Sequence, residues 1–147
     1  MALKDKKELA SLAISFVGIL MIVWGLLHSL IMISVREELI ASNVDHNIVS
    51  LITLSYLGII VMISGNGLIV IYAAMSGIKK GEKWAYSICI SQGILFSFVT
   101  ILLITLQPKV SVLNFSADLI LVLAIITDLA ISVLILGPLI IWRKELL

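Results

Sequence analysis

Four long apolar stretches dominate the sequence and constrain the fold more than any other feature. They cover residues 9–35, 48–78, 84–107 and 119–142, and the only charge inside them is Asp128. Each is longer than the roughly 20 residues that a helix needs to cross a bilayer. Since 61% of the residues are hydrophobic and only 13% are charged, the chain has too little polar surface for a soluble globule. The sequence predicts an all-α integral membrane four-helix bundle with short loops, a single domain over residues 1–147.

The positions of the basic residues indicate which side of the membrane each end faces. Eight of the ten lysines and arginines fall on one side of a four-span arrangement, and only Arg36 and Lys109 fall on the other. Because basic residues accumulate on the cytoplasmic side, we expect both termini and the turn at residues 79–83 to be cytoplasmic. The first apolar run is too long for the core of a signal peptide, so we expect it to remain as a helix. The expected location is the cell membrane, with a multi-pass topology.

The residue types required by common cofactor and nucleic-acid chemistry are scarce. Cys89 is the only cysteine, which excludes an internal disulfide and a CxxC redox or metal site. The sequence has no glycine-rich nucleotide-binding motif and no HExxH motif, and no basic surface that suggests nucleic acid. We therefore expect no cofactor. The expected partners are the lipid bilayer and other membrane helices, from other subunits or from copies of this chain.

The two loops expected outside the cell, after the first and third spans, each contain a short sequence motif. Ser34 and Glu37 have the spacing of a capping box, which predicts a short interfacial helix after the first span. Asn114 begins the tripeptide Asn-Phe-Ser, so it is a candidate for N-glycosylation on the outer face.

The turn between the second and third spans reads Gly-Ile-Lys-Lys-Gly-Glu-Lys-Trp-Ala-Tyr over residues 77–86. It resembles a loop in many small four-helix prokaryotic integral membrane proteins, some of them labelled DoxX-like. The resemblance is confined to this turn and implies the four-helix membrane fold, without the quinone chemistry attributed to some DoxD-type relatives. The residues also suit the turn physically, because Gly81 can adopt the left-handed conformation and Glu82 suits the positive start of a helix. Trp84 is expected to anchor in the aromatic belt.

Asp128 marks the first candidate site. A charge at that depth costs at least about 2.5–3.5 kcal/mol on insertion scales, so the side chain should face protein rather than lipid. Counting about 1.5 Å per residue from the outer ends of the spans places His28, Tyr56 and Asp128 in one layer, about 12 to 15 Å deep. We predict that His28 and Asp128 approach each other, as a proton-active or ligand-binding pair or as a buried hydrogen bond between two helices. Alternatively, Asp128 pairs with another subunit.

Other residues are predicted to hold helices together. Asn66 and Gln92 are expected to form an interhelical polar layer closer to the cytoplasm, where Gly65 and Gly67 would allow close approach. Small residues at helical spacing are typical of packing faces, and we expect these faces to serve a neighbouring subunit. The small and polar residues of these faces are Gly25, Ser29, Gly93, Ser97, Ala124 and Ser132.

Met21, His28 and Met32 lie along one side of the first span. Thioether and imidazole groups suit Cu(I), which makes these residues an alternative ligand set. Methionines at helical spacing more commonly fill packing positions, so we expect no metal.

Three classes of function are compatible with these features. The first is an accessory or structural subunit of a larger integral-membrane complex, of respiratory or oxidase type, with no chemistry of its own. The second is a small oligomeric transporter or proton-coupled carrier that uses Asp128. The third is a membrane-embedded acid/base enzyme that uses His28, Tyr56 and Asp128. We favour the first class, and no enzymatic activity, because the chain has little mass outside the apolar runs and no catalytic motif.

Overall fold

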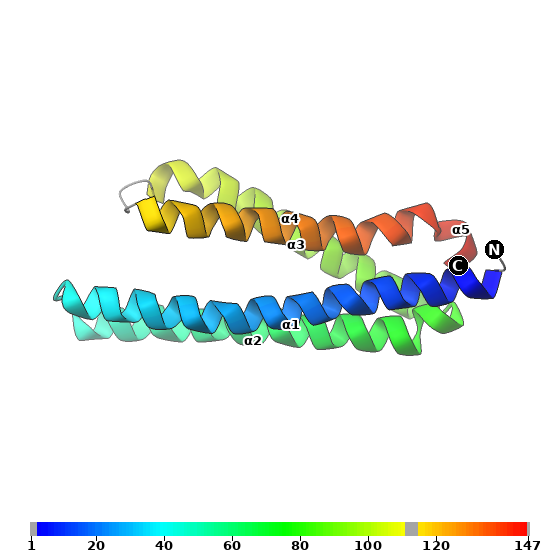
Figure 1. Cartoon of the computed structure of the whole chain (residues 1–147), viewed down its shortest axis with the longest axis horizontal. Coiled ribbons are helices and arrows are strands. Elements are labelled where there is room, and N and C mark those ends of the chain that lie inside the picture. The colour runs from blue at the N-terminus through cyan, green and yellow to red at the C-terminus, as the bar shows by residue number, and fades with distance from the viewer. Residues whose placement is uncertain (1–2, 111–114, 147) are drawn as a thin grey trace. The chain divides into compact units, whose positions relative to one another are not determined.

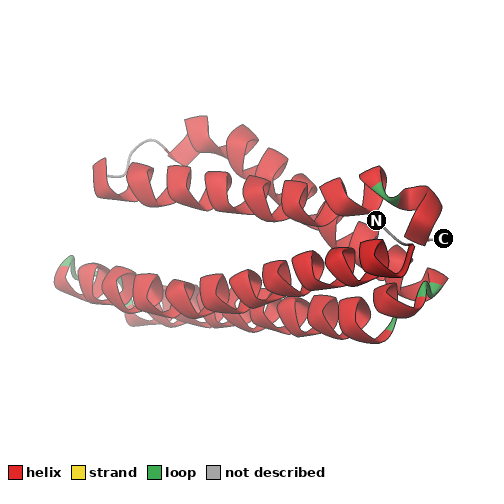
Figure 2. Cartoon of the chain, turned by 45° about the vertical axis from the view of Figure 1, so that its right-hand side comes forward, coloured by secondary structure: helices red, strands yellow, loops and turns green. Residues whose placement is uncertain are grey.

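The computed structural model describes residues 3–110 and 115–146, and within these ranges the chain is helical and has no strand. Figures 1 and 2 show long helices joined by short turns. In chain order the elements are α1 (Leu3–Ala41), α2 (His46–Ser76), the 3-10 helix η1 (Ile78–Lys80), α3 (Lys83–Val110), α4 (Phe115–Ile141) and α5 (Arg143–Leu146). The prediction of an all-α fold is confirmed.

Among the described residues, three helical segments are long and apolar enough to cross a membrane. They are Lys6–Ala41, His46–Lys80 and Lys83–Leu102, each of at least 20 residues. The continuously described stretch of α4, Ile125–Ile141, is apolar but shorter than a full span. The first three predicted spans therefore correspond to helices of sufficient length, and the fourth stays a prediction.

The first helix is longer than predicted. α1 continues without a break to Ala41, so no separate helix starts at Ser34. The Ser34 hydroxyl donates to the Leu30 carbonyl of its own helix (3.3 Å) instead of capping the residues that follow. The capping-box prediction was wrong because arginine, glutamate and leucine are strong helix formers, and each residue added to an existing helix gains a hydrogen bond.

A tight turn reverses the chain between α1 and α2. Asn43 adopts the left-handed conformation (φ 54°), which asparagine tolerates better than most residues. The Val44 amide donates to the Leu39 carbonyl (3.1 Å), and this six-residue closure is the Schellman ending of a helix. The Asp45 carboxylate then accepts a hydrogen bond from the Asn47 amide (2.8 Å) and caps the start of α2.

The turn between α2 and α3 has the conformation that its glycines predict. Gly81 is left-handed (φ 78°), as expected, and its amide donates to the Ile78 carbonyl (3.0 Å). Gly77 is needed for a different reason, since a Cβ atom there would lie 3.0 Å from both the Ala73 carbonyl oxygen and the Trp84 ring. A larger residue at Gly77 would push α2 and α3 apart at this turn.

The chain divides into two compact units, Met1–Val17 with Val70–Leu147 and Gly18–Ile69. In the first unit α3 packs against α4, as Figure 1 shows. In the second unit α1 approaches α2 closely, because a Cβ atom at Gly67 would lie only 2.6 Å from the Gly18 carbonyl oxygen. A side chain at this position would clash with the backbone of α1, so the close approach of the two helices requires glycine.

Candidate functional site

Among the described side chains, the buried polar residues gather mainly on α3 and α4, which pack against each other. The buried positions on both helices recur at intervals of three and four, the spacing of one helix face. They are Ala85, Tyr86, Cys89, Gly93, Phe96 and Thr100 on α3, and Asp128, Ile131, Ser132, Ile135 and Leu139 on α4. The interface is thus apolar near Leu139 and becomes polar from Ser132 to Asp128.

A hydroxyl cluster forms around Gly93, between α3 and α4. A Cβ atom at Gly93 would lie 2.6 Å from the Leu136 side chain, so the glycine leaves room for this leucine. The Gly93 carbonyl oxygen lies 2.8 Å from Ser132 Oγ and 3.0 Å from Ser97 Oγ, and the two hydroxyls also contact each other. Each hydroxyl carries one proton, so they share the carbonyl as their common acceptor.

Asp128 lies one helical turn from Ser132 on the same face of α4. Only 5% of its surface is exposed, although a carboxyl group is among the most costly groups to remove from water. Because of this cost, we expected Asp128 to face protein rather than lipid. The structure buries Asp128 on the side of α4 that carries Ser132, whose hydroxyl bonds to the Gly93 carbonyl of α3.

The register of the two helices identifies what lies at the level of Asp128. Ser97 and Ser132 are in contact across the interface, and the helices run in opposite directions. One turn further along, Asp128 comes to the level of Thr100. Thr100 is also buried, and its hydroxyl donates to the Phe96 carbonyl of α3 (2.8 Å). Carboxyl and hydroxyl groups therefore occupy one layer of the interface, which we call the α3–α4 polar layer: Ser97, Thr100, Asp128 and Ser132.

The α3–α4 polar layer is suited to two kinds of chemistry. A protonated carboxyl group donates one hydrogen bond and accepts others, whereas an ionised one only accepts. Within hydrocarbon, such a group either binds and releases a proton or links helices by hydrogen bonds. The hydroxyls of Ser97, Ser132 and Thr100 donate to the Gly93 and Phe96 carbonyls, so toward a carboxyl group they act as acceptors.

His28 is bonded within its own helix. Its Nδ1–H donates to the Trp24 carbonyl (2.9 Å), and the two rings meet edge to face with centroids 4.8 Å apart. The Trp24 Nε1 atom is buried and has no hydrogen-bond partner among the described residues. His28 and Tyr56, which is half-buried, belong to the second compact unit, and Asp128 belongs to the first. The pairing of His28 with Asp128 therefore stays a prediction.

The second predicted polar layer also involves both units. Asn66 is half-buried in the second unit. The Oε1 atom of Gln92, in the first unit, is buried and has no partner in the part of the chain that the structure describes. Of the two glycines expected to allow close approach there, only Gly67 does so, since no described atom of another helix lies within 4 Å of a Cβ built at Gly65.

The small residues of the predicted packing faces mostly contact helices of the same chain. Gly25 faces α2, where a Cβ atom would lie 3.2 Å from the Ile60 carbonyl oxygen, and Gly93 faces α4. Ser29 instead bonds to the Leu26 carbonyl of its own helix. Gly25 and Gly93 thus pack within the chain, and contacts of these faces with a neighbouring subunit stay a prediction. The Ala124 side chain and the glycosylation candidate Asn114 lie outside the described residues.

The methionines of the alternative copper-ligand set lie in different environments. Met21 is fully buried, whereas Met32 lines a groove between α1 and α2. Among the described residues, no group of three histidine, cysteine, aspartate or glutamate side chains is placed to hold a metal ion.

Sequence reasoning did not anticipate three contacts of the first unit. The buried Ser11 hydroxyl donates to the Ala74 carbonyl (2.8 Å) and links α1 to α2. The Tyr86 hydroxyl donates to the Leu139 carbonyl (3.4 Å), and Lys79 forms an ion pair with Glu8 (3.1 Å). The only available signal was that Ser11 and Tyr86 carry hydroxyls at the ends of apolar runs.

No protein-family model, curated protein or solved structure matches this chain.

Proposed function

We propose that this chain is an integral membrane protein with four spans that acts as an accessory or structural subunit of a larger membrane complex, of respiratory or oxidase type. The main support is that polar side chains bond inside the chain while large apolar side chains are exposed. Hydroxyl groups of α3 and α4 bond within the chain, whereas Leu12, Leu51 and Leu54 are 64–66% exposed, as are many large apolar residues of α1 and α2. Such a surface is stable only against lipid or other apolar helices.

The ends of the helices support a cytoplasmic location for both termini. The Glu8–Lys79 ion pair brings the start of α1 to the α2–α3 turn, and the Tyr86–Leu139 bond brings the start of α3 to the end of α4. Lys79, Lys80, Lys83, Arg143 and Lys144 are exposed in these same segments. Basic residues gathered in this way favour the cytoplasmic side.

We also propose a distant relationship to the small four-helix prokaryotic membrane proteins, some labelled DoxX-like. The support is the turn at residues 77–86, where Gly81 needs its left-handed conformation and Gly77 its missing side chain. Both glycines of the shared pattern thus have a physical role.

A second candidate function is a small proton-coupled carrier. The observation that favours it is the buried Asp128 in a layer of hydroxyl groups. Intramembrane carboxyl groups commonly bind and release the coupled proton in such carriers.

Labelling of engineered cysteines tests the topology. In a Cys89→Ala background, a membrane-impermeant maleimide added to intact cells should label Ser42→Cys and leave Lys80→Cys unlabelled, because the bilayer separates the two turns. Both cysteines should react after the cells are opened, which controls for accessibility. Reaction of Lys80→Cys in intact cells would contradict the orientation.

Purification in a mild detergent tests the subunit function. The tagged chain should migrate with other integral-membrane subunits at a fixed stoichiometry, because its exposed apolar surface is then covered by partner helices. A stable homo-oligomer that lacks any other subunit would contradict the accessory role and favour the carrier.

A further inference from the structure

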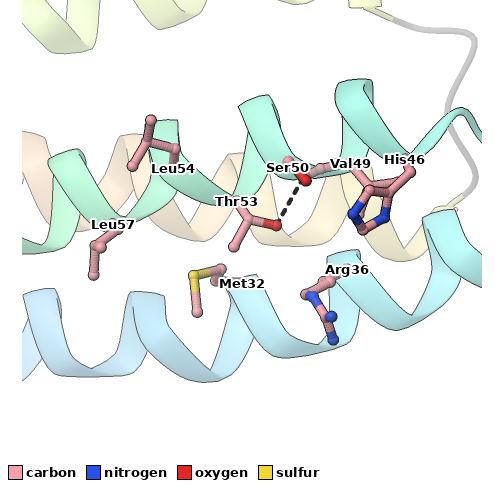
Figure 3. Close-up of a pocket in the computed structure, with 8 residues that line it drawn as sticks. All are labelled: Met32, Arg36, His46, Val49, Ser50, Thr53, Leu54 and Leu57. Carbon is pink, nitrogen blue, oxygen red and sulfur yellow. Dashed lines mark hydrogen bonds between the residues drawn. The ribbon is translucent and has the colours of Figure 1, made fainter.

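The hairpin of α1 and α2 carries a groove of about 300 Å³ near the loop that joins the two helices (Figure 3). Each helix contributes residues at intervals of three or four positions, so one face of each helix forms a wall. The lining residues are Met32 and Arg36 on α1, and His46, Val49, Ser50, Thr53, Leu54 and Leu57 on α2. All of them belong to one compact unit.

The two ends of this groove differ in character. Arg36 and His46 lie toward the loop, and Leu57 lies at the far end (Figure 3). Thr53 adds no free donor between them, because its hydroxyl already donates to the Val49 carbonyl (2.8 Å). The groove therefore has a basic end and a largely apolar remainder.

Arg36 is available for an anionic ligand. Within the described ranges it forms no salt bridge, and its acidic neighbours Glu37 and Glu38 do not line the groove. The carboxylate of Asp45, the residue before His46, accepts the hydrogen bond that caps α2. A guanidinium group binds phosphate through two parallel hydrogen bonds, and an imidazole N–H supplies another donor.

We propose that this groove binds one anionic phospholipid of the outer leaflet, with its phosphate at Arg36 and His46 and one acyl chain along Met32, Leu54 and Leu57. The inference rests on the proposed membrane location and topology. It adds a ligand that neither the subunit function nor the carrier function requires.

The length of the groove favours a phospholipid over a free phosphate ion. α2 rises about 16 Å from His46 to Leu57. This is roughly half of the hydrocarbon core of about 30 Å, the depth reached by the acyl chain of one leaflet. A free phosphate ion would use only the basic end and leave the apolar walls uncovered.

Native mass spectrometry of the full chain in detergent tests the proposal. Dioleoyl phosphatidylglycerol should bind about tenfold more tightly than dioleoyl phosphatidylcholine, and the Arg36→Gln/His46→Gln variant should lose about this factor. Lys80→Gln is the matched control, because Lys80 is an exposed basic residue outside the groove. Both Arg36 and His46 are exposed, so their replacement should leave the helix content and the elution volume of the chain unchanged.

A second measurement uses the unmodified chain. Phosphatidylglycerol with six-carbon acyl chains should bind more weakly than the dioleoyl lipid, because it covers less of the apolar wall. Three results would overturn the proposal. They are equal binding of the six-carbon and dioleoyl phosphatidylglycerols, equal binding of phosphatidylglycerol and phosphatidylcholine, and displacement of the bound phosphatidylglycerol by millimolar inorganic phosphate. Recovery of the chain in the soluble fraction of cells would instead refute the membrane location. A membrane-bound chain without lipid preference would refute the lipid site alone.

Discussion

Replacing Gly67 by alanine should destabilise the α1–α2 hairpin by about 1–3 kcal/mol, the usual cost of overpacking a close contact. The added Cβ atom would lie 2.6 Å from the Gly18 carbonyl oxygen and 3.2 Å from the Ile22 amide nitrogen. Both are backbone atoms of α1, so the helix itself must shift to make room. The free energy of unfolding in mixed SDS micelles, followed by circular dichroism, measures the loss.

The matched control for this variant is Gly65→Ala on the same helix. No described atom of another helix lies within 4 Å of a Cβ at Gly65, so this change should be neutral or stabilising by up to about 1 kcal/mol. Equal losses in the two variants would mean that helix propensity or lipid contact decides their stability. That result would contradict the close approach of α1 and α2 at Gly67.

Asp128→Leu should destabilise the chain by about 1–3 kcal/mol, because it removes a buried carboxyl group and leaves its hydrogen-bonding surroundings unsatisfied. Asp128→Asn keeps the size of the side chain and its ability to hydrogen-bond, so its stability should stay within about 1 kcal/mol of the unchanged chain. The same unfolding measurement compares the two variants. A stable Asp128→Leu variant would show that the carboxyl group does not link the helices.

The same pair of variants separates the two proposed functions. A structural subunit should tolerate Asp128→Asn, so the amount of assembled complex should not change. A proton-coupled carrier should lose transport with Asp128→Asn, because an amide does not bind and release a proton in the physiological range, while its stability is retained. Proton-driven uptake into vesicles, measured beside the stability, reports the difference.

Several structural features followed from the sequence because they depend on local chemistry. The length and hydropathy of the runs predicted the helices, since a long apolar segment in lipid must satisfy its own backbone. The left-handed Gly81 followed from the conformational freedom of glycine. The end of α1 was predicted wrongly because Ser34 and Glu37 match a capping box equally well inside a continuous helix. Spacing alone does not say whether the backbone amides are free.

The sequence by itself determined that Asp128 should lie among protein groups, because a carboxyl group in hydrocarbon costs too much free energy. Only the tertiary structure decided that it is buried one helical turn from Ser132, whose hydroxyl bonds to the Gly93 carbonyl of α3. In the same way, Gly65 and Gly67 are equivalent in sequence, and only helix packing decided that Gly67 meets the backbone of α1. The physical reason is that burial cost and helical periodicity are properties of a single segment, so they can be predicted from the sequence of that segment. The partner of a helix face depends on how two segments dock, and many apolar faces of similar shape compete for that contact.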